Sequence, residues 1–336
     1  MSTASLGIAA LLDAYYRRRF TAAGLVESTV ALEDGAATTT MHCWRFPPPD
    51  GAREKDNDDP RPVLVLLHGF GPPATWQWRR QVGPLSRRFR LVVPDLLFFG
   101  PGSRTSAQGP GARSEAHQAE AVAKLIAAIV PSGSGASPVS VVGTSYGGFV
   151  AYHVARLLGP GRVGRVVIAS SDLLKGADDD RALLLRAAAA GASSAAAVAE
   201  RVEDLMLPRT PERMRRLMEL AYHKPRRFTP GFVLRDLVQF LYSDSIEEKQ
   251  ELIKGITLGD KDKFQLTPLR QQVLVLWGQH DQIFPIEKAV QVARQLGANA
   301  RLEILQNTGH MPHEEDPKRF NEALLNFLLP PPSSAL

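Results

Sequence analysis

Cysteine is nearly absent from this chain of 336 residues, because Cys43 is the only one and no internal disulfide can form. No cluster of cysteine and histidine has the spacing of metal ligands, so no metal site is predicted. No uninterrupted apolar run approaches the roughly 18 residues that a membrane-spanning helix needs. A chain that cannot form an internal disulfide fits a reducing compartment, and we expect this one to be cytoplasmic.

The chain also lacks a large excess of positive or negative charge. Forty lysines and arginines face 35 acids, which leaves a formal net charge of +5. The arginines are spread through predicted helices, and no basic element is interleaved with aromatic residues. We therefore expect a solvated, arginine-rich surface and no nucleic-acid partner.

The N-terminus has an amphipathic pattern. Apolar residues recur at helical spacing between positions 8 and 15 and lead into three arginines at 17–19. A secretory signal has its positive charge before the apolar run, so the order excludes one. We predict that residues 1–24 form a helical extension packed on the following domain. The alternatives are an organelle-targeting segment, which Asp13 disfavours, and attachment to a membrane surface.

Continuous apolar runs separated by helical patterns dominate the rest of the chain. Continuous apolar runs are typical of strands in a parallel sheet whose two faces are covered by helices. The alternation predicts an α/β fold with a doubly wound, mostly parallel sheet. The predicted strands are 63–67, 91–93, 139–142, 166–168, 273–276 and 302–305, with antiparallel strands 28–32 and 38–46 at one edge; the helices between them are 76–89, 114–130, 146–158 and 286–296.

One long segment breaks this alternation. Residues 171–271 contain no strand-like run and are too many for a single crossover, so they predict a helical cap above the sheet. Its candidate helices are 182–190, 192–205, 211–222, 232–242 and 246–256. The expected organisation is an extension (1–24), a core in two parts (25–170 and 272–330), the cap (171–271) and a tail (331–336).

The strongest chemical signal is Gly143-Thr144-Ser145-Tyr146-Gly147, directly after a predicted strand and directly before a predicted helix. This is the G-x-S-x-G pattern of a nucleophile elbow in its strand–turn–helix context. A serine on such a turn needs glycine neighbours so that strand and helix can approach closely. Ser145 is therefore the candidate nucleophile.

A serine nucleophile requires a base, and the base requires an acid that orients it. His310 follows the predicted strand 302–305 and is the candidate base, with His313 as its competitor. Asp281 follows strand 273–276 and is the candidate acid, with Asp172 as the alternative. Both candidates leave a strand at its carboxyl end, where open α/β sheets bind ligands.

Acyl transfer also needs donors for a negative oxygen. Residues 68–71, His-Gly-Phe-Gly, leave the first central strand and can form such a loop. We expect the backbone amides of Phe70 and of Tyr146, the residue after the nucleophile, to be the two donors.

These motifs together resemble the α/β-hydrolase family over roughly residues 26–329. The segments 68–72, 142–150 and 278–285 look like its branch of carboxylesterases and meta-cleavage-product hydrolases, and most like uncharacterised soluble plant members. The resemblance implies a serine hydrolase with a helical cap and no cofactor. Carbon–carbon bond hydrolases of this branch typically have asparagine before the serine and tryptophan after the histidine, where this chain has Thr144 and Met311.

We therefore predict hydrolysis of small to medium, fairly apolar carboxylic esters, with a small-molecule ester as partner. The alternatives are a hydrolase-like receptor with slow turnover and a carbon–carbon bond hydrolase. Apolar side chains of the cap either line a substrate pocket or belong to an ordinary core. They are Met206, Leu207, Met214, Leu217, Met218, Phe228, Phe232, Phe240 and Tyr242.

Overall fold

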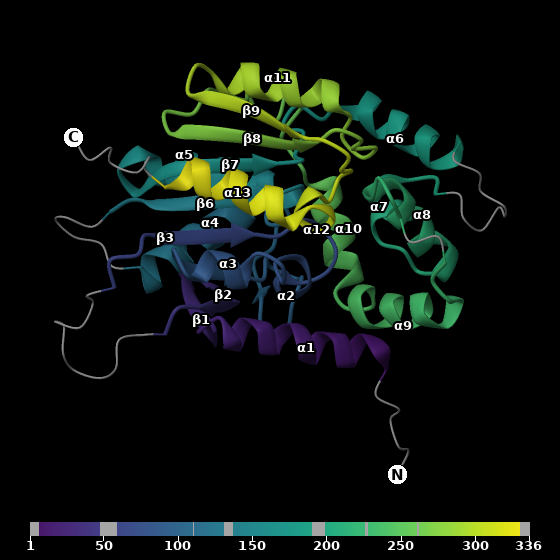
Figure 1. Cartoon of the computed structure of the whole chain (residues 1–336), viewed down its shortest axis with the longest axis horizontal. Helices are drawn as coiled ribbons and strands as arrows, with labels where there is room; N and C mark the ends of the chain where they lie inside the picture. Colours follow the sequence, from purple (N-terminus) through teal and green to yellow (C-terminus); the bar gives the residue numbers. More distant parts are fainter. Residues whose placement is uncertain are drawn as a thin grey trace, which may run out of the picture.

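The computed structural model describes residues 7–47, 59–109, 111–130, 137–189, 199–225, 228–260 and 262–329, and within these ranges a nine-stranded sheet forms the centre (Figure 1). The strands are β1 (Val26–Asp34), β2 (Ala37–Arg45), β3 (Val63–Leu67), β4 (Arg90–Pro94), β5 (Arg104–Thr105), β6 (Val139–Thr144), β7 (Val163–Ala169), β8 (Gln272–Gly278) and β9 (Ala300–Leu305). The helices before the insertion are α1 (Ile8–Ala22), α2 (Ala74–Gln77), α3 (Val82–Ser86), α4 (Glu115–Ile129) and α5 (Tyr146–Arg162). The later helices are α6 (Ala177–Ala189), α7 (Val202–Met206), α8 (Pro211–Ala221), α9 (Gly231–Tyr242), α10 (Ile246–Lys254), α11 (Ile286–Leu296), α12 (Pro312–Glu315) and α13 (Pro317–Leu328).

The sheet has the order β1-β2-β4-β3-β6-β7-β8-β9, and β5 pairs with β2. All neighbours from β4 to β9 are parallel, whereas β1, β2 and β5 are joined by antiparallel pairings. The predicted doubly wound, mostly parallel sheet with an antiparallel edge is therefore confirmed. Its two central strands, β3 and β6, are buried along their whole length, as expected from the apolar residues that make up all of β3 and half of β6.

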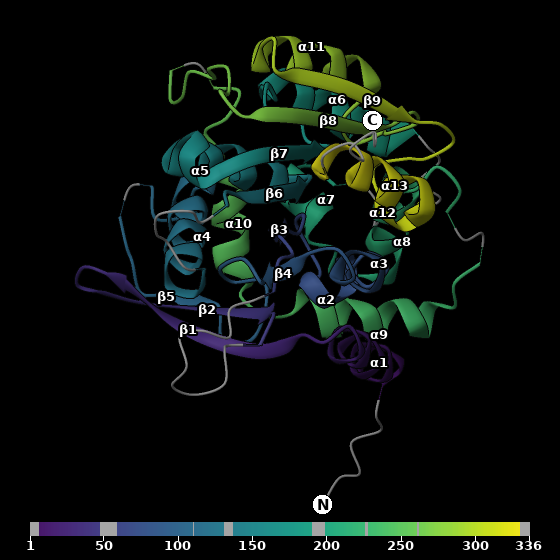
Figure 2. The same ribbon diagram turned by 60° about the vertical axis from the view of Figure 1, so that its left-hand side comes forward.

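Two apolar cores cover the two faces of the sheet. Helices α4, α5 and α11 contribute buried side chains to one core, α3 and α13 contribute to the other, and α1 contributes Ala9 to the first and Phe20 to the second. Figure 2 shows α4 and α5 on the side of the sheet opposite to α3 and α13. Helices on both faces hide the sheet from water, and the carboxyl ends of its strands stay open for a site.

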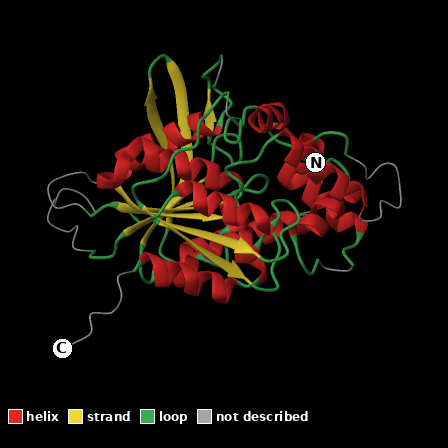
Figure 3. Ribbon diagram, turned by 90° about the horizontal axis from the view of Figure 1, so that it is seen from above, coloured by secondary structure: helices red, strands yellow, loops and turns green. Residues whose placement is uncertain are grey.

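Helices α6 to α10 follow β7 and precede β8, and we call this segment the insertion (residues 171–271). It lies beyond one end of the sheet, toward which the central strands point (Figures 1 and 3). Of the predicted helix 192–205, only α7 is helical in the described part, and residues 190–198 lie outside the described residues. No helix in the described ranges is long and apolar enough to cross a membrane.

The single helix predicted over residues 76–89 is wrong, because the chain forms two short helices there, α2 and α3. The guanidinium of Arg79 donates to the carbonyl of Trp76, which a continuing helix would use for its own backbone. At the break, the side chain of Trp78 is buried in the core that also contains α3 and α13, and Gln77 contacts the loop at residues 69–72.

Candidate active site

Ser145 stands on the turn between β6 and α5 with a positive φ of 50°, a conformation that side chains with a Cβ rarely adopt. Two glycines make the turn possible. A Cβ on Gly143 would lie 2.0 Å from the carbonyl oxygen of Gly147, and one on Gly147 would lie 2.3 Å from the oxygen of Leu67. The turn therefore depends on the absence of those side chains and stores backbone strain at the serine.

The side chains of Ser145, His310 and Asp281 form one chain of hydrogen bonds. His310 Nδ1 lies 2.9 Å from Asp281 Oδ2, and its Nε2 lies 2.9 Å from Ser145 Oγ. A carboxylate has no proton to give, so Nδ1–H donates to Asp281 and Nε2 accepts from the serine hydroxyl. All three residues are buried, which shields this chain of contacts from bulk water.

Asp281 is held rigidly in its turn. Its second oxygen, Oδ1, accepts hydrogen bonds from the backbone N–H groups of Ile283 and Phe284, both at 2.9 Å. The alternative acid, Asp172, instead accepts from the backbone of Leu174 at 3.0 Å and lies 3.4 Å from Lys288 Nζ. The structure thus brings Asp281, and not Asp172, to the histidine.

His313, the competing base, has no contact with Ser145. Its ring is fully buried between Trp78 and Phe320, and neither nitrogen has a hydrogen-bond partner among the described residues. Burial, helped by the charge of Arg79, lowers the pKa of His313 to about 3. The side chain is therefore a neutral part of the core.

The loop after β3 lies against the serine, since a Cβ on Gly69 would be 3.1 Å from the Cβ of Ser145. Gln77 fixes this loop through three hydrogen bonds. Its Oε1 accepts from Gly69 N–H at 2.9 Å, and its Nε2 donates to the carbonyls of Gly69 (2.9 Å) and Pro72 (2.7 Å). Phe70, whose amide is a predicted donor, is between those two anchored residues.

The ring of His68 also holds this loop in place through hydrogen bonds. Leu96 N–H donates to His68 Nε2 at 3.0 Å, so the proton is on Nδ1, which donates to the carbonyl of Gly69 at 2.7 Å. Burial lowers the pKa of His68, which keeps the ring neutral in this tautomer.

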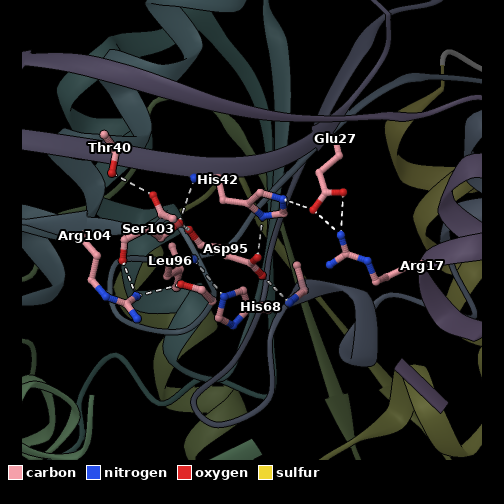
Figure 4. Close-up of polar contacts among 12 residues, drawn as sticks. Arg17, Glu27, Thr40, His42, His68, Asp95, Leu96, Ser103 and Arg104 are labelled. Carbon is pink, nitrogen blue, oxygen red and sulfur yellow. Dashed lines mark hydrogen bonds and ion pairs between the residues drawn. The ribbon is translucent and has the colours of Figure 1, made fainter. Parts of the chain in front are cut away.

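A buried ionic network anchors the start of α2, and through it Gln77. Asp95, at the end of β4, accepts from Ala74 N–H at 2.7 Å and from His42 Nδ1 at 2.7 Å (Figure 4). The other ring nitrogen of His42 lies 2.9 Å from Glu27. Burial alone would lower the pKa of His42, but the hydrogen bonds and charges of both carboxylates outweigh it and raise the pKa above 6.5.

Two cavities meet at Ser145. The larger one encloses about 200 Å³ between the sheet and the insertion, and the smaller one, which Ser145 also lines, encloses about 40 Å³. The smaller cavity is almost entirely apolar. Its lining includes Phe149, Leu183, Val202, Ile253, Ile256 and Phe284.

Five of the nine apolar cap residues considered from the sequence line the larger cavity: Met206, Met214, Leu217, Met218 and Tyr242. Leu207 belongs to the core, and the three phenylalanines at 228, 232 and 240 are exposed. A pocket role for these three is therefore wrong. Helix α9 buries the face that carries Leu234 and Leu241, and the phenylalanines project from other faces.

The larger cavity also has a charged wall. Glu314 pairs with Arg79 and lies 3.5 Å from Arg80, while its Oε1 has no hydrogen-bond partner within the described ranges. Burial raises the pKa of Glu314 to about 7, although both guanidinium groups lower it. Tyr16 of α1 lines the same cavity, and Arg79 lies over its ring.

Gln77, Glu314 and Tyr16 were missed from the sequence. None of them belongs to a recognised motif. Each is placed at the site by contacts with other segments: Gln77 with the loop at 69–72, and Glu314 and Tyr16 with Arg79. The polar Gln77 between two tryptophans was the one available signal of an unusual buried amide.

No group of three or more histidine, cysteine or acidic residues able to hold a metal occurs in the described ranges.

Comparison with known families gives one clear match. The model of the alpha/beta hydrolase family matches residues 64–323, more than half of the chain. The matched span begins in β3 and ends in α13, and it includes Ser145, Asp281 and His310.

The similar proteins include dienoate hydrolases and a carboxylesterase. The 2-hydroxy-6-oxo-2,4-heptadienoate hydrolase of Pseudomonas putida is 27% identical over 275 residues, which cover 79% of this chain and 88% of that protein. The structure of 2-hydroxy-6-oxo-6-phenylhexa-2,4-dienoate hydrolase from Rhodococcus sp. strain RHA1 superposes with a TM-score of 0.67 and 21% identity, covering 90% of this chain and 98% of that one. A carboxylesterase from Bacillus subtilis gives a TM-score of 0.62 at 19% identity, covering 94% and 98%. The two structures show a shared fold, and the resemblance to plant members stays a prediction.

Proposed function

The chain belongs to the alpha/beta hydrolase family, and we propose that it is a serine hydrolase that cleaves carboxylic esters through an acyl-enzyme on Ser145. The observation that carries this proposal is the pair of 2.9 Å contacts that His310 makes with Ser145 and Asp281. A nucleophile hydrogen-bonded to a base, with that base hydrogen-bonded to an acid, is the arrangement that activates serine for acyl transfer.

In the first step, Ser145 Oγ attacks the ester carbonyl carbon while His310 Nε2 takes the hydroxyl proton. Asp281 stabilises the imidazolium that forms and keeps its tautomer fixed. The carbonyl oxygen becomes negative, and the N–H groups of Phe70 and Tyr146 donate to it. His310 then gives its proton to the departing alcohol oxygen as the carbon–oxygen bond breaks.

In the second step, water attacks the acyl-enzyme, and His310 Nε2 takes a proton from that water. The second tetrahedral intermediate collapses when the carbon–Oγ bond breaks and the proton returns to Ser145. The carboxylic acid leaves, and the starting state is restored. Each step uses only groups of this chain, the substrate and water.

The cavities support a substrate with two unequal parts. A small apolar group fits the smaller cavity, and a larger, mainly apolar group fits the larger one, since Ser145 borders both. Glu314 Oε1 offers the larger group one hydrogen-bonding atom. We therefore propose small to medium, fairly apolar esters as the substrate class.

The test is hydrolysis of p-nitrophenyl esters of increasing acyl length by wild-type protein and by Ser145→Ala. We expect the variant to fall to the background rate while its unfolding temperature stays near that of the wild type. Ser140→Ala, on the same strand β6 and also buried, is the matched control and should keep full activity. Unchanged turnover in Ser145→Ala would remove the proposal.

A second candidate is hydrolysis of a carbon–carbon bond, which the name of the Pseudomonas putida relative favours. Thr144 and Met311 disfavour it for this chain, because they stand where that group typically has asparagine and tryptophan. Assaying a 2-hydroxy-6-oxo-dienoate beside the ester series decides between them. A higher kcat/KM for the dienoate would replace ester hydrolysis as the proposed reaction.

A further inference from the structure

Large apolar side chains are exposed in one region far more than elsewhere. Nine such side chains are exposed among the described residues, and six of them lie on α1, on α9 or just before α9. Their exposed fractions run from 41% to 83%. The six are Ile8, Leu11, Tyr15, Phe228, Phe232 and Phe240, and we call this surface the α1–α9 face.

The two helices are packed together, so these side chains border one surface. Ala9 N–H, at the start of α1, donates to Asp236 of α9 at 2.7 Å. The ring of Trp76 contacts both Tyr16 of α1 and Phe240 of α9. Figures 1 and 2 show α1 and α9 side by side from two directions. Positions 8, 11 and 15 also share one stripe of α1, because their spacing follows the helical repeat.

Positive charge accompanies this apolar surface. Arg18 and Arg19 are exposed and continue the stripe of Tyr15 one turn further along α1. Arg235 is exposed on α9 between the two exposed phenylalanines of that helix. Of the acids on these helices, Asp236 accepts from the α1 backbone and Asp13 accepts from an indole N–H. Apolar and aromatic side chains flanked by arginines are the composition of helices that lie in a lipid interface.

The same helices form a wall of the larger cavity. Tyr16 lines it from α1, and Leu237, Leu241 and Tyr242 line it from α9. The helix pair thus has one side toward the solvent and another toward the cavity. A lipid surface against the outer side would place the cavity next to a reservoir of apolar molecules.

We propose that the α1–α9 face docks on the surface of an anionic lipid bilayer. The phenylalanine and aliphatic side chains enter the interfacial region, and Arg18, Arg19 and Arg235 contact lipid phosphates. The arginines favour a lipid surface over a second copy of this chain, because two copies would bring like charges together.

The test is co-sedimentation of the full chain with vesicles of phosphatidylcholine and phosphatidylglycerol, and with vesicles of phosphatidylcholine alone. We expect binding to the mixed vesicles that weakens with salt and with loss of the anionic lipid. Leu11→Ser/Phe232→Ser should lower the partition coefficient by about tenfold or more, because two buried side chains are removed from the interface. Arg18→Glu/Arg19→Glu should lower it by a similar factor.

Leu157→Ser, on α5, is the matched control, since Leu157 is 54% exposed and Leu11 is 57% exposed. It should bind vesicles like the wild type. Failure of the wild type to bind, or an equal loss in the control, would overturn the proposal. So would a wild-type dimer in the absence of lipid that the Leu11→Ser/Phe232→Ser variant converts to monomer. Hydrolysis of a p-nitrophenyl ester in buffer should be unchanged in all these variants, which separates this surface from the proposed reaction.

Discussion

The side chain of Gln77 provides a sharp test of how the site is built. The change Gln77→Glu is nearly isosteric and keeps the acceptor for Gly69 N–H. It removes both N–H donors and places a carboxylate oxygen against the carbonyls of Gly69 and Pro72, which accept from Nε2 at 2.9 and 2.7 Å in the wild type. The loop that carries Phe70 must then move away from the charge.

The size of the effect follows from these contacts. Losing one oxyanion donor outright lowers kcat by about 10²- to 10³-fold in other hydrolases. Here the donor is displaced and not removed, so we expect a loss of about 10- to 100-fold in kcat, or about 1.4 to 2.7 kcal/mol in the activation free energy. Gln77 also lines the larger cavity, so KM should rise as well, by a smaller factor than kcat falls.

The assay compares kcat and KM for one p-nitrophenyl ester with the rate at which a fluorophosphonate labels Ser145. Both reactions build negative charge on an oxygen that the proposed donors bind, the carbonyl oxygen in one and the phosphoryl oxygen in the other, so both should slow by a similar factor. Gln81→Glu is the matched control. Gln81 is equally buried and donates to the carbonyl of His313 at 2.8 Å, and no hydrogen bond joins it to the loop among the described residues.

A carboxylate at a buried position also destabilises the fold, so Gln77→Met serves as an uncharged second variant. It fills the same space and removes all three hydrogen bonds. If both Gln77 variants fold and keep kcat within twofold of the wild type, the loop holds itself in place and the reasoning is wrong. Equal losses in Gln77→Glu and Gln81→Glu would point to general destabilisation instead.

Two further predictions concern the acid and the buried network. Asp281→Asn should lower kcat by about 10⁴-fold, because an amide cannot hold His310 in the required tautomer. Asp172→Asn should change kcat by no more than a few fold. A larger loss in Asp172→Asn than in Asp281→Asn would make Asp172 the acid. His42 has a raised pKa in the folded state, so it stabilises the fold fully below its ordinary pKa of 6.5, and this contribution is lost as the pH rises through the folded-state pKa. Urea unfolding on both sides of pH 6.5 should show that decline in the wild type and a flatter curve in His42→Gln, whereas parallel curves would show that His42 binds no extra proton on folding.

The sheet was predictable because its signal is local. Runs of three to five apolar residues mark the buried strands β3, β4, β7 and β8, and Ser140 alone interrupts the run in β6. The two residues of β5 carry no periodicity and could not be recognised. The break between α2 and α3 was not predicted either; there the Arg79 guanidinium contacts the Trp76 carbonyl, which a continuous helix would use for its own backbone.

The meeting of Ser145, His310 and Asp281 was also predictable, because each follows a strand whose carboxyl end lies at the same edge of the sheet. The cavity was not. Its walls come from α1 and the insertion, and which face of α9 turns inward depends on packing against both of them. Periodicity alone could not separate the buried leucines of α9 from its exposed phenylalanines.

Contacts near the two ends of α9 explain how such distant segments form one site. Glu315, just after the histidine loop, accepts from Gly309 N–H at 2.6 Å through one oxygen and from His223 N–H at 3.0 Å through the other. One carboxylate therefore joins the loop of His310 to the segment between α8 and α9. At the far end of α9, Phe240 and Trp76 join the insertion to α1 and α2, and α2 carries Gln77. These two contacts therefore hold the loop of His310 and the helix that carries Gln77 against the same part of the insertion.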